Sequence, residues 1–184
     1  MFIFFVIFII IMIIFLISLI LIYNNLISLR NNIDKAWANI DVLLKQRSNE
    51  IPNLVNTVKA YMKHERKTLE SLTRIRSYVL ETKTLSRKAA ADNFITDLIK
   101  TVFAVAEQYP DLKAGENFLK LQRRITGLEN ELADRREFYN DSVTIYNTRI
   151  QSFPDLIMAK VIHLNRVELF EATEEDKKYL NVNF

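Results

Sequence analysis

The sequence predicts an all-α protein in which an N-terminal transmembrane helix continues into an up-down antiparallel four-helix bundle. Three observations support this prediction. The chain of 184 residues opens with a long apolar run, contains only two glycines and three prolines, and then repeats apolar residues at intervals of three and four. Glycine and proline supply the tight turns of β-sandwiches and barrels, so their scarcity favours helices.

The apolar run extends from Phe2 to Ile22, and Ser18 is its only polar residue. A bilayer core about 30 Å thick requires about 20 such residues in a helix. Insertion of this run into a membrane is favoured by roughly 6 to 12 kcal/mol. A cleaved signal peptide would start with basic residues and end at a small-residue cleavage site, and the run has neither. We therefore expect residues 1–22 to be a retained transmembrane anchor that contacts the lipid bilayer through Phe2 to Ile22.

The charges next to the run predict its orientation. Arg30 and Lys35 follow it, and positive residues beside a span favour the cytoplasmic side. We therefore expect a single-pass protein with its N-terminus outside and the bulk of its chain in the cytoplasm. Tyr23 and the two asparagines after it are typical of the headgroup layer.

Residues 23–153 are predicted to form the helical bundle domain. No glycine or proline occurs before Pro52, so the anchor is expected to continue unbroken into the first bundle helix and to end near Arg47. Its apolar stripe, which predicts that Trp37 lies in the bundle interior, consists of Leu26, Leu29, Ile33, Trp37, Ile40 and Leu44. Residues Arg47 to Pro52 are predicted to break the helix, because proline is tolerated only in the first helical turn.

Three further helices are predicted from the same periodicity. The second begins within this break, where Ser48 or Asn49 could cap it and Pro52 falls in its first turn. Its stripe consists of Ile51, Leu54, Val55, Val58, Met62, Leu69, Leu72, Ile75 and Val79. The third is capped by Thr84 or Ser86, ends before Pro110, and is followed by a loop through Gly115. The fourth, from Glu116 to Phe153, repeats Phe118, Ile125, Leu132, Tyr139, Tyr146 and Phe153 at intervals of seven. The tail, residues 154–184, shows no clean apolar face; we expect it to be partly ordered, with helix at its start.

The composition argues against several classes of function. Acidic residues are interleaved with the basic ones that give a net charge of +3, so no basic patch indicates binding to nucleic acid. Without cysteine there is no thiolate nucleophile or cysteine-ligated metal. Gly115 and Gly127 are isolated, which excludes a glycine-rich phosphate loop. Neither His64 nor His163 follows a glutamate at the spacing of a carboxylate-bridged metal site, and both are expected to be ordinary surface histidines.

A set of polar residues borders the apolar stripes: Asp34, Asn39, Asp41, Glu107, Glu129, Asn130, Arg135, Arg136, Asn140, Asp141 and Asn147. Carboxylates and guanidinium groups close together could form a functional constellation. We favour the alternative, in which these residues fix the register of the bundle or are solvated at its edges. The sequence therefore predicts no catalytic residue, no cofactor, no metal ligand and no enzymatic activity.

Motifs along the chain resemble those of the LemA family. They begin with Tyr23-Asn24, Leu29-Arg30-Asn31 and Asp34-Lys35-Ala36-Trp37-Ala38-Asn39-Ile40-Asp41-Val42, and continue with Ile51-Pro52-Asn53-Leu54-Val55, His64-Glu65, Ala104-Val105-Ala106-Glu107, Tyr109-Pro110-Asp111-Leu112-Lys113-Ala114, Asn117-Phe118-Leu119, Glu129-Asn130, Arg135-Arg136, Phe138-Tyr139-Asn140-Asp141, Tyr146-Asn147 and Phe153-Pro154. This resemblance spans Tyr23 to about Pro154. The tail departs from the family pattern at Asp155 to Met158 and at Leu180, whereas Val182 and Phe184 resemble the family's C-terminal end.

The resemblance implies a bacterial inner-membrane protein with a single N-terminal span, a helical bundle domain and no established enzymatic activity. One branch of the family resembles proteins that shape magnetosome membranes. The first functional hypothesis is a membrane-anchored scaffold or interaction protein with an unknown protein partner. The second is a homo-oligomer that assembles to shape or organise membrane. The anchor lacks the small residues of tightly packed spans, so assembly is expected to depend on the domain, with Tyr23 to Arg47 as the favoured surface. An unrecognised enzyme has no supporting constellation of residues.

Overall fold

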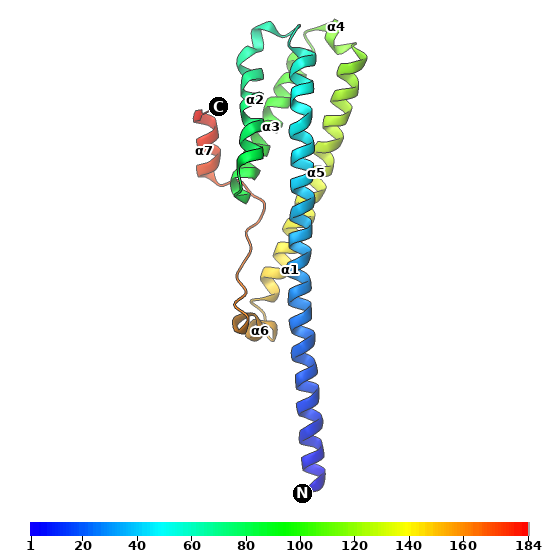
Figure 1. Cartoon of the computed structure of the whole chain (residues 1–184), viewed down its shortest axis with the longest axis vertical. Coiled ribbons are helices and arrows are strands. Elements are labelled where there is room, and N and C mark those ends of the chain that lie inside the picture. The colour runs from blue at the N-terminus through cyan, green and yellow to red at the C-terminus, as the bar shows by residue number, and fades with distance from the viewer. Residues whose placement is uncertain (184) are drawn as a thin grey trace. The chain divides into compact units, whose positions relative to one another are not determined.

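The computed structural model describes residues 1–183, and helices account for most of this range (Figure 1). The elements are α1 (Phe2–Val58), a short 3-10 helix η1 (Lys63–Glu65), α2 (Arg66–Glu81), α3 (Leu85–Ala106), α4 (Pro110–Lys113), α5 (Glu116–Arg149), α6 (Asp155–Val161) and α7 (Glu174–Asn183). No strand occurs among these residues, which confirms the all-α fold class. The expected family-like position Phe184 lies outside the described residues.

The contacts divide the chain into two compact units. Unit 1 consists of Met1–Trp37 and Phe138–Leu169, and unit 2 consists of Ala38–Glu137 and Phe170–Phe184. Both α1 and α5 contribute residues to each unit. The predicted division into residues 1–22, 23–153 and 154–184 separates an anchor, a bundle domain and a tail rather than units defined by contacts. It stays a prediction.

Unit 2 contains the four-helix bundle. The last part of α1, then α2, α3 and the first part of α5 run alternately up and down beside one another (Figure 1). Apolar residues from all four fill the interior, including Ile51, Leu72, Ile95 and Ile125. The short α7 packs against α3. The predicted bundle is therefore present, and α4 occupies part of the region where a loop through Gly115 was expected.

The predicted helix break between Arg47 and Pro52 is wrong. Helix α1 continues through Pro52 to Val58, and the chain turns at residues 59–65 instead. Proline has no N–H to donate to the carbonyl oxygen four residues earlier, which belongs to Ser48. Arg76 on α2 supplies the missing donor, because its Nε lies 3.0 Å from that oxygen. A tertiary contact thus satisfies the group that the proline leaves unpaired. The predicted second helix is consequently divided between the end of α1 and α2.

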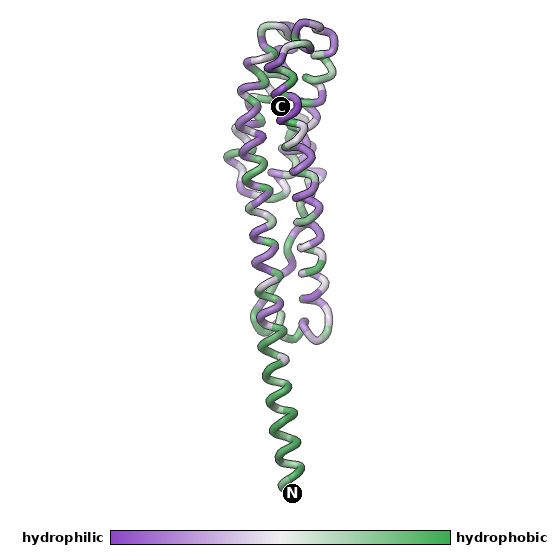
Figure 2. The backbone as a smooth tube through the Cα atoms, turned by 90° about the vertical axis from the view of Figure 1, so that its right-hand side faces the viewer, coloured by the Kyte–Doolittle hydropathy of each residue, from purple (hydrophilic) through white to green (hydrophobic). Residues whose placement is uncertain are grey.

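Unit 1 combines the first part of α1 with the end of α5, with α6 and with an extended segment, residues 164–169. Every residue of α1 before Leu19 is exposed. This exposed part coincides with the apolar run (Figure 2), and α1 is the one helix of the described residues long and apolar enough to cross a membrane. Leu26, Ile33 and Ala36 are buried farther along.

Trp37 corrects a prediction, because it is half-buried rather than enclosed. Its ring meets the edge of Tyr139, with 6.2 Å between the ring centroids and an angle of 61° between the planes. Its neighbour Ala36 takes the fully buried position instead. The predicted stripe residues Leu26, Ile33, Ile40 and Leu44 are buried, so the correction concerns Trp37 and not the stripe as a whole.

Candidate functional site

Four charged side chains meet inside the bundle of unit 2. Arg47 on α1 is 1% exposed and Asp92 on α3 is 0% exposed. Their closest atoms, Nη1 of Arg47 and Oδ1 of Asp92, are 2.5 Å apart. Arg136 on α5 also forms an ion pair with Asp92, and Nη2 of Arg47 lies 3.5 Å from Oε1 of Glu129. We call these four residues the buried charge network.

Helix periodicity places both buried members of the network. Arg47 lies seven residues after the buried Ile40 and seven before the buried Leu54, so an unbroken helix directs it into the interior. Asp92 precedes Ile95 and Ile99 at intervals of three and four on α3. Neither residue was singled out from the sequence. The expected break at Arg47 ended the apolar stripe of α1 too early, and Asp92 was not recognised as a core position of α3. The signal was present: Arg47 continues the same heptad row.

Hydrogen bonds and charge balance keep the network together. Nη2 of Arg47 donates to Oγ1 of Thr96 at 2.8 Å. Burial, together with the nearby charge of Arg47, lowers the pKa of Arg136 to about 10. Burial also lowers the pKa of Arg47, and the carboxylate of Glu129 opposes this shift. Both arginines remain charged at neutral pH, so two cations face two carboxylates.

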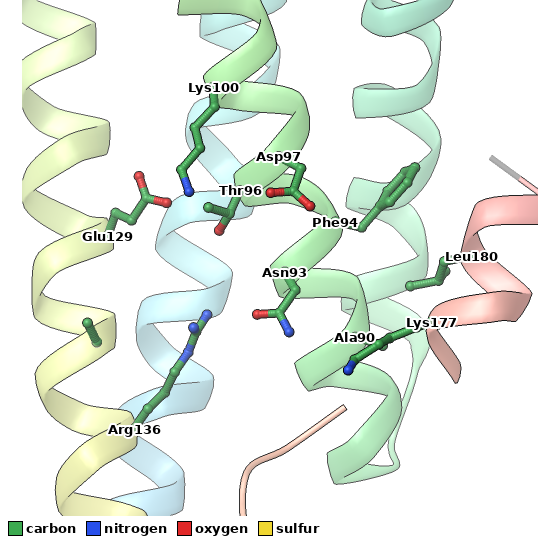
Figure 3. A pocket seen from close by; sticks show the side chains of 11 residues that line it. Ala90, Asn93, Phe94, Thr96, Asp97, Lys100, Glu129, Arg136, Lys177 and Leu180 are labelled. Carbon is green, nitrogen blue, oxygen red and sulfur yellow. The ribbon is translucent and has the colours of Figure 1, made fainter. Parts of the chain in front are cut away.

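A cavity of ≈ 570 Å³ adjoins the network between α3, α5 and α7. Arg136 and Glu129 extend into the space between α3 and α5, and Lys100 enters it from α3 (Figure 3). Asp97 and Lys177 also line it, so charges of both signs surround the cavity. No histidine lines it. Within the described residues, no group of three or more His, Asp or Glu side chains is arranged to hold a metal ion.

The buried charge network contains two of the polar residues singled out in the sequence, Glu129 and Arg136. Asp41 forms a separate cluster, in which Nζ of Lys45 lies 2.6 Å away and Lys88 makes a second ion pair. Asn140 is half-buried. The others lie on the surface, as do both histidines: Asp34, Asn39, Glu107, Asn130, Arg135, Asp141, His64 and His163. Two of these make exposed ion pairs, Asp34 with Arg30 and Arg135 with Glu131.

Asn147 belongs to unit 1 and has a different role. Its Nδ2 donates to the carbonyl oxygen of Val167 at 2.9 Å, and its Oδ1 accepts from the N–H of Val167 at 3.0 Å. The side-chain amide thus pairs with the main chain as a neighbouring strand would. The hydroxyls of Tyr139 and Tyr146 donate to the carbonyl oxygens of Glu168 and Asn165. The hydrogen bonds of these three side chains of α5 to the extended segment all go to its main chain.

Comparison with known proteins gives consistent matches. The LemA family profile matches residues 36–184. The chain is 28% identical over 180 residues to Protein LemA of Metamycoplasma hominis, and the alignment covers 95% of this chain and 80% of that protein. It is also 28% identical over 80 residues to magnetosome protein MamQ of Magnetospirillum gryphiswaldense, which is 44% of this chain and 29% of that relative.

A second MamQ protein matches in the same way. Magnetosome protein MamQ 2 of Paramagnetospirillum magneticum is 28% identical over 81 residues, 44% of this chain and 30% of that relative. This chain thus corresponds to less than a third of either MamQ protein. Neither the family description nor the names of these relatives refers to a catalysed reaction. Because the family profile covers well over half of its length, the chain belongs to the LemA family.

Proposed function

We propose that this protein is a single-pass scaffold of a bacterial inner membrane, in which the bundle of unit 2 presents a binding surface to other proteins in the cytoplasm. One observation carries the proposal. Helix α1 begins as an exposed apolar run and contributes, without an interruption of the helix, the core residues Ile51 and Leu54 of unit 2. A membrane anchor and a structural helix of the bundle are therefore one element.

The buried charge network supports a structural role. Its members neutralise one another inside the bundle, as in proteins where buried polar groups specify one helix register. A reaction centre would instead need a nucleophile with an activating base, or a general acid and base directed at a substrate. The network contains neither a histidine nor a hydroxyl–base pair. The exposed surfaces of the bundle are then the parts available to partners.

The anchor is tested by washing membranes with alkaline carbonate. We expect the full-length chain to stay in the membrane pellet, because the residues from Phe2 to Ile22 are held in the bilayer core. Full-length protein in the supernatant would overturn the anchor, and a shortened soluble form would indicate cleavage.

The orientation is tested with a single cysteine, which is straightforward in a chain that has none. Gly127 is the better position, because an added Cβ there meets no atom within 4 Å, whereas one at Gly115 meets the carbonyl oxygen of Leu112 at 3.1 Å. We expect Gly127→Cys to react with an impermeant maleimide only after the membrane is permeabilised. Labelling of intact cells would show that the bundle faces outward.

Self-assembly that organises the membrane is the second candidate function. The match to the magnetosome protein MamQ supports this candidate, because one branch of the family resembles proteins that shape magnetosome membranes. The test is crosslinking in native membranes of the full chain and of a version that carries an unrelated single-span anchor. The span has only Ser18 to bond across a helix pair, so we expect oligomers to survive the exchange. Loss of oligomers on exchange would assign assembly to the anchor, and their absence in both would favour the monomeric scaffold.

A further inference from the structure

An apolar patch lies on the outer face of α6 and the turn before it. Phe153 is 82% exposed, Ile157 is 56% exposed and Val161 is 68% exposed. Ile157 and Val161 are four residues apart and lie on the same side of the helix, and Phe153 precedes them in the turn after α5. Three neighbouring large apolar side chains on a surface indicate a site of contact rather than scattered exposure.

The inward face of α6 is fixed by other residues, so the outward direction of the patch is built into the fold. Asp155 and Ala159, also four residues apart, are buried. The carboxylate Oδ2 of Asp155 lies 2.6 Å from Nε of Arg149 at the end of α5. This ion pair and the small side chain of Ala159 seat the helix on its neighbours. Ile157 and Val161 must therefore face away from unit 1.

The patch lies beside the end of the apolar run of α1. Burial along α1 starts at Leu19, continues at Ile22 and becomes complete at Leu26, so the rest of unit 1 covers the helix from the last turn of the run onward. Figure 1 shows that α6 and the turn before it reach this level of α1. The helix that carries the patch therefore lies at the level of α1 where the apolar run ends.

The exposed charges next to the patch in sequence are basic. Between residues 149 and 166 the basic side chains are Arg149, Lys160 and Arg166, all of them exposed. The one acidic residue of this range is Asp155, which is buried and paired with Arg149. An amphipathic element with apolar residues outward and cations beside them is suited to the boundary between headgroups and acyl chains.

From this arrangement we infer that α6 and its preceding turn form a second membrane contact, which enters the headgroup region of the leaflet from which α1 emerges and favours anionic lipid. The inference rests on the proposed function, because it requires that Phe2 to Ile22 span the bilayer. Its occupant is the lipid surface. A protein partner covering the same face is an outcome of the test that would overturn it.

The test uses the full chain in vesicles of phosphatidylcholine, with or without phosphatidylglycerol. Single cysteines carry an environment-sensitive dye, and lipids brominated near the headgroup quench it where it enters the membrane. Ile157→Cys probes the patch and Ser18→Cys probes the anchor. Phe138→Cys is the matched control, since it is 55% exposed, apolar and in the same unit, but lies about 16 Å farther up α5 from Arg149.

The expected result is blue-shifted and quenched emission at Ile157 and Ser18, with aqueous emission at Phe138. Quenching at Ser18 combined with aqueous emission at Ile157 would overturn the second contact and leave the anchor intact. Aqueous emission at both would overturn the proposed anchor itself. The labelled chain is also measured in native membranes. If the dye at Ile157 is shielded there but not in the lipid vesicles, a protein covers the patch and the lipid assignment is wrong. Equal quenching with and without phosphatidylglycerol would refute the preference for anionic lipid.

Discussion

Units 1 and 2 satisfy their inward-facing polar groups in different ways. In unit 2 the buried charge network opposes guanidinium groups to carboxylates. In unit 1 the side chains of Tyr139, Tyr146 and Asn147 bond to the main chain of residues 164–169. The same helix, α5, supplies groups of both kinds. One helix can therefore contribute charged groups to the interior of a bundle and neutral hydrogen bonds to an extended segment.

Removing the carboxylate at the centre of the network is expected to have the largest effect. Asp92→Ala leaves Arg47 buried without its closest partner, and breaking a buried pair in this way costs about 3 to 5 kcal/mol. Chemical denaturation should show this loss in the free energy of unfolding. Asp34→Ala is the control, since its ion pair with Arg30 is exposed and 3.7 Å long and should contribute less than about 1 kcal/mol. Similar losses for the two variants would refute the difference between buried and surface charge.

A charged group that bonds to the main chain is expected to have an intermediate effect. Arg76→Ala removes the donor to the carbonyl oxygen of Ser48 and should cost about 1 to 3 kcal/mol. In a Pro52→Ala background, the N–H of the new alanine can bond to that oxygen. The cost of Arg76→Ala should therefore be smaller there, which a double-mutant cycle measures. Purely additive effects would show that Arg76 does not compensate for the proline.

The neutral bonds of unit 1 are expected to contribute less. Asn147→Ala removes two hydrogen bonds to Val167 and should cost about 1 to 2 kcal/mol. Hydrogen exchange should report the change locally, with faster exchange of the Val167 amide while the amides of α3 are unaffected. Asn130→Ala on the exposed face of the same helix is the control. Unchanged protection of Val167 would show that the tyrosine hydroxyls alone hold the segment.

The smallest effect is expected from pH at the Asp41 cluster. Burial raises the pKa of Asp41, but the bonds from Lys45 and Lys88 outweigh it, so the pKa lies below its ordinary value of 3.8. Near pH 3.8 the unfolded chain therefore binds more protons at this site than the folded chain, and the stabilisation is complete only above that pH. Asp41→Asn should lower the melting temperature at neutral pH, and the difference from the wild type should vanish in strong acid. A constant difference would contradict the linkage.

Periodicity predicted the helices well where the apolar residues of a helix repeat at intervals of three and four. The all-α fold, the long N-terminal helix and the repeat in α5 could be recognised because packing demands the same spacing that the sequence shows. The prediction at Pro52 was wrong because the free-energy cost of a proline inside a helix depends on whether a distant group bonds to the carbonyl oxygen four residues earlier. That group, Arg76, lies on another helix, and no local sequence pattern predicts its bond to the carbonyl oxygen of Ser48.

The candidate site was harder to predict than the fold for a related reason. Arg47 and Asp92 stand at core positions of their heptad rows, so a strict extension of the rows finds them, but their pairing depends on how α1 and α3 align. Asn147 was singled out for its position beside the apolar stripe. Its partner Val167 lies in a segment without periodicity, where side-chain pattern carries no information about hydrogen bonds to the main chain.

The way in which α5 holds residues 164–169 also bears on how the sequence of that segment can change. Tyr139, Tyr146 and Asn147 recognise only peptide groups, and every amino acid except proline offers the same ones. The path of the main chain in this segment therefore does not depend on the identity of most of its residues. Exposed residues such as Asn165 and Glu168 can therefore be substituted, or replaced by a recognition sequence, without a change in the path of the main chain.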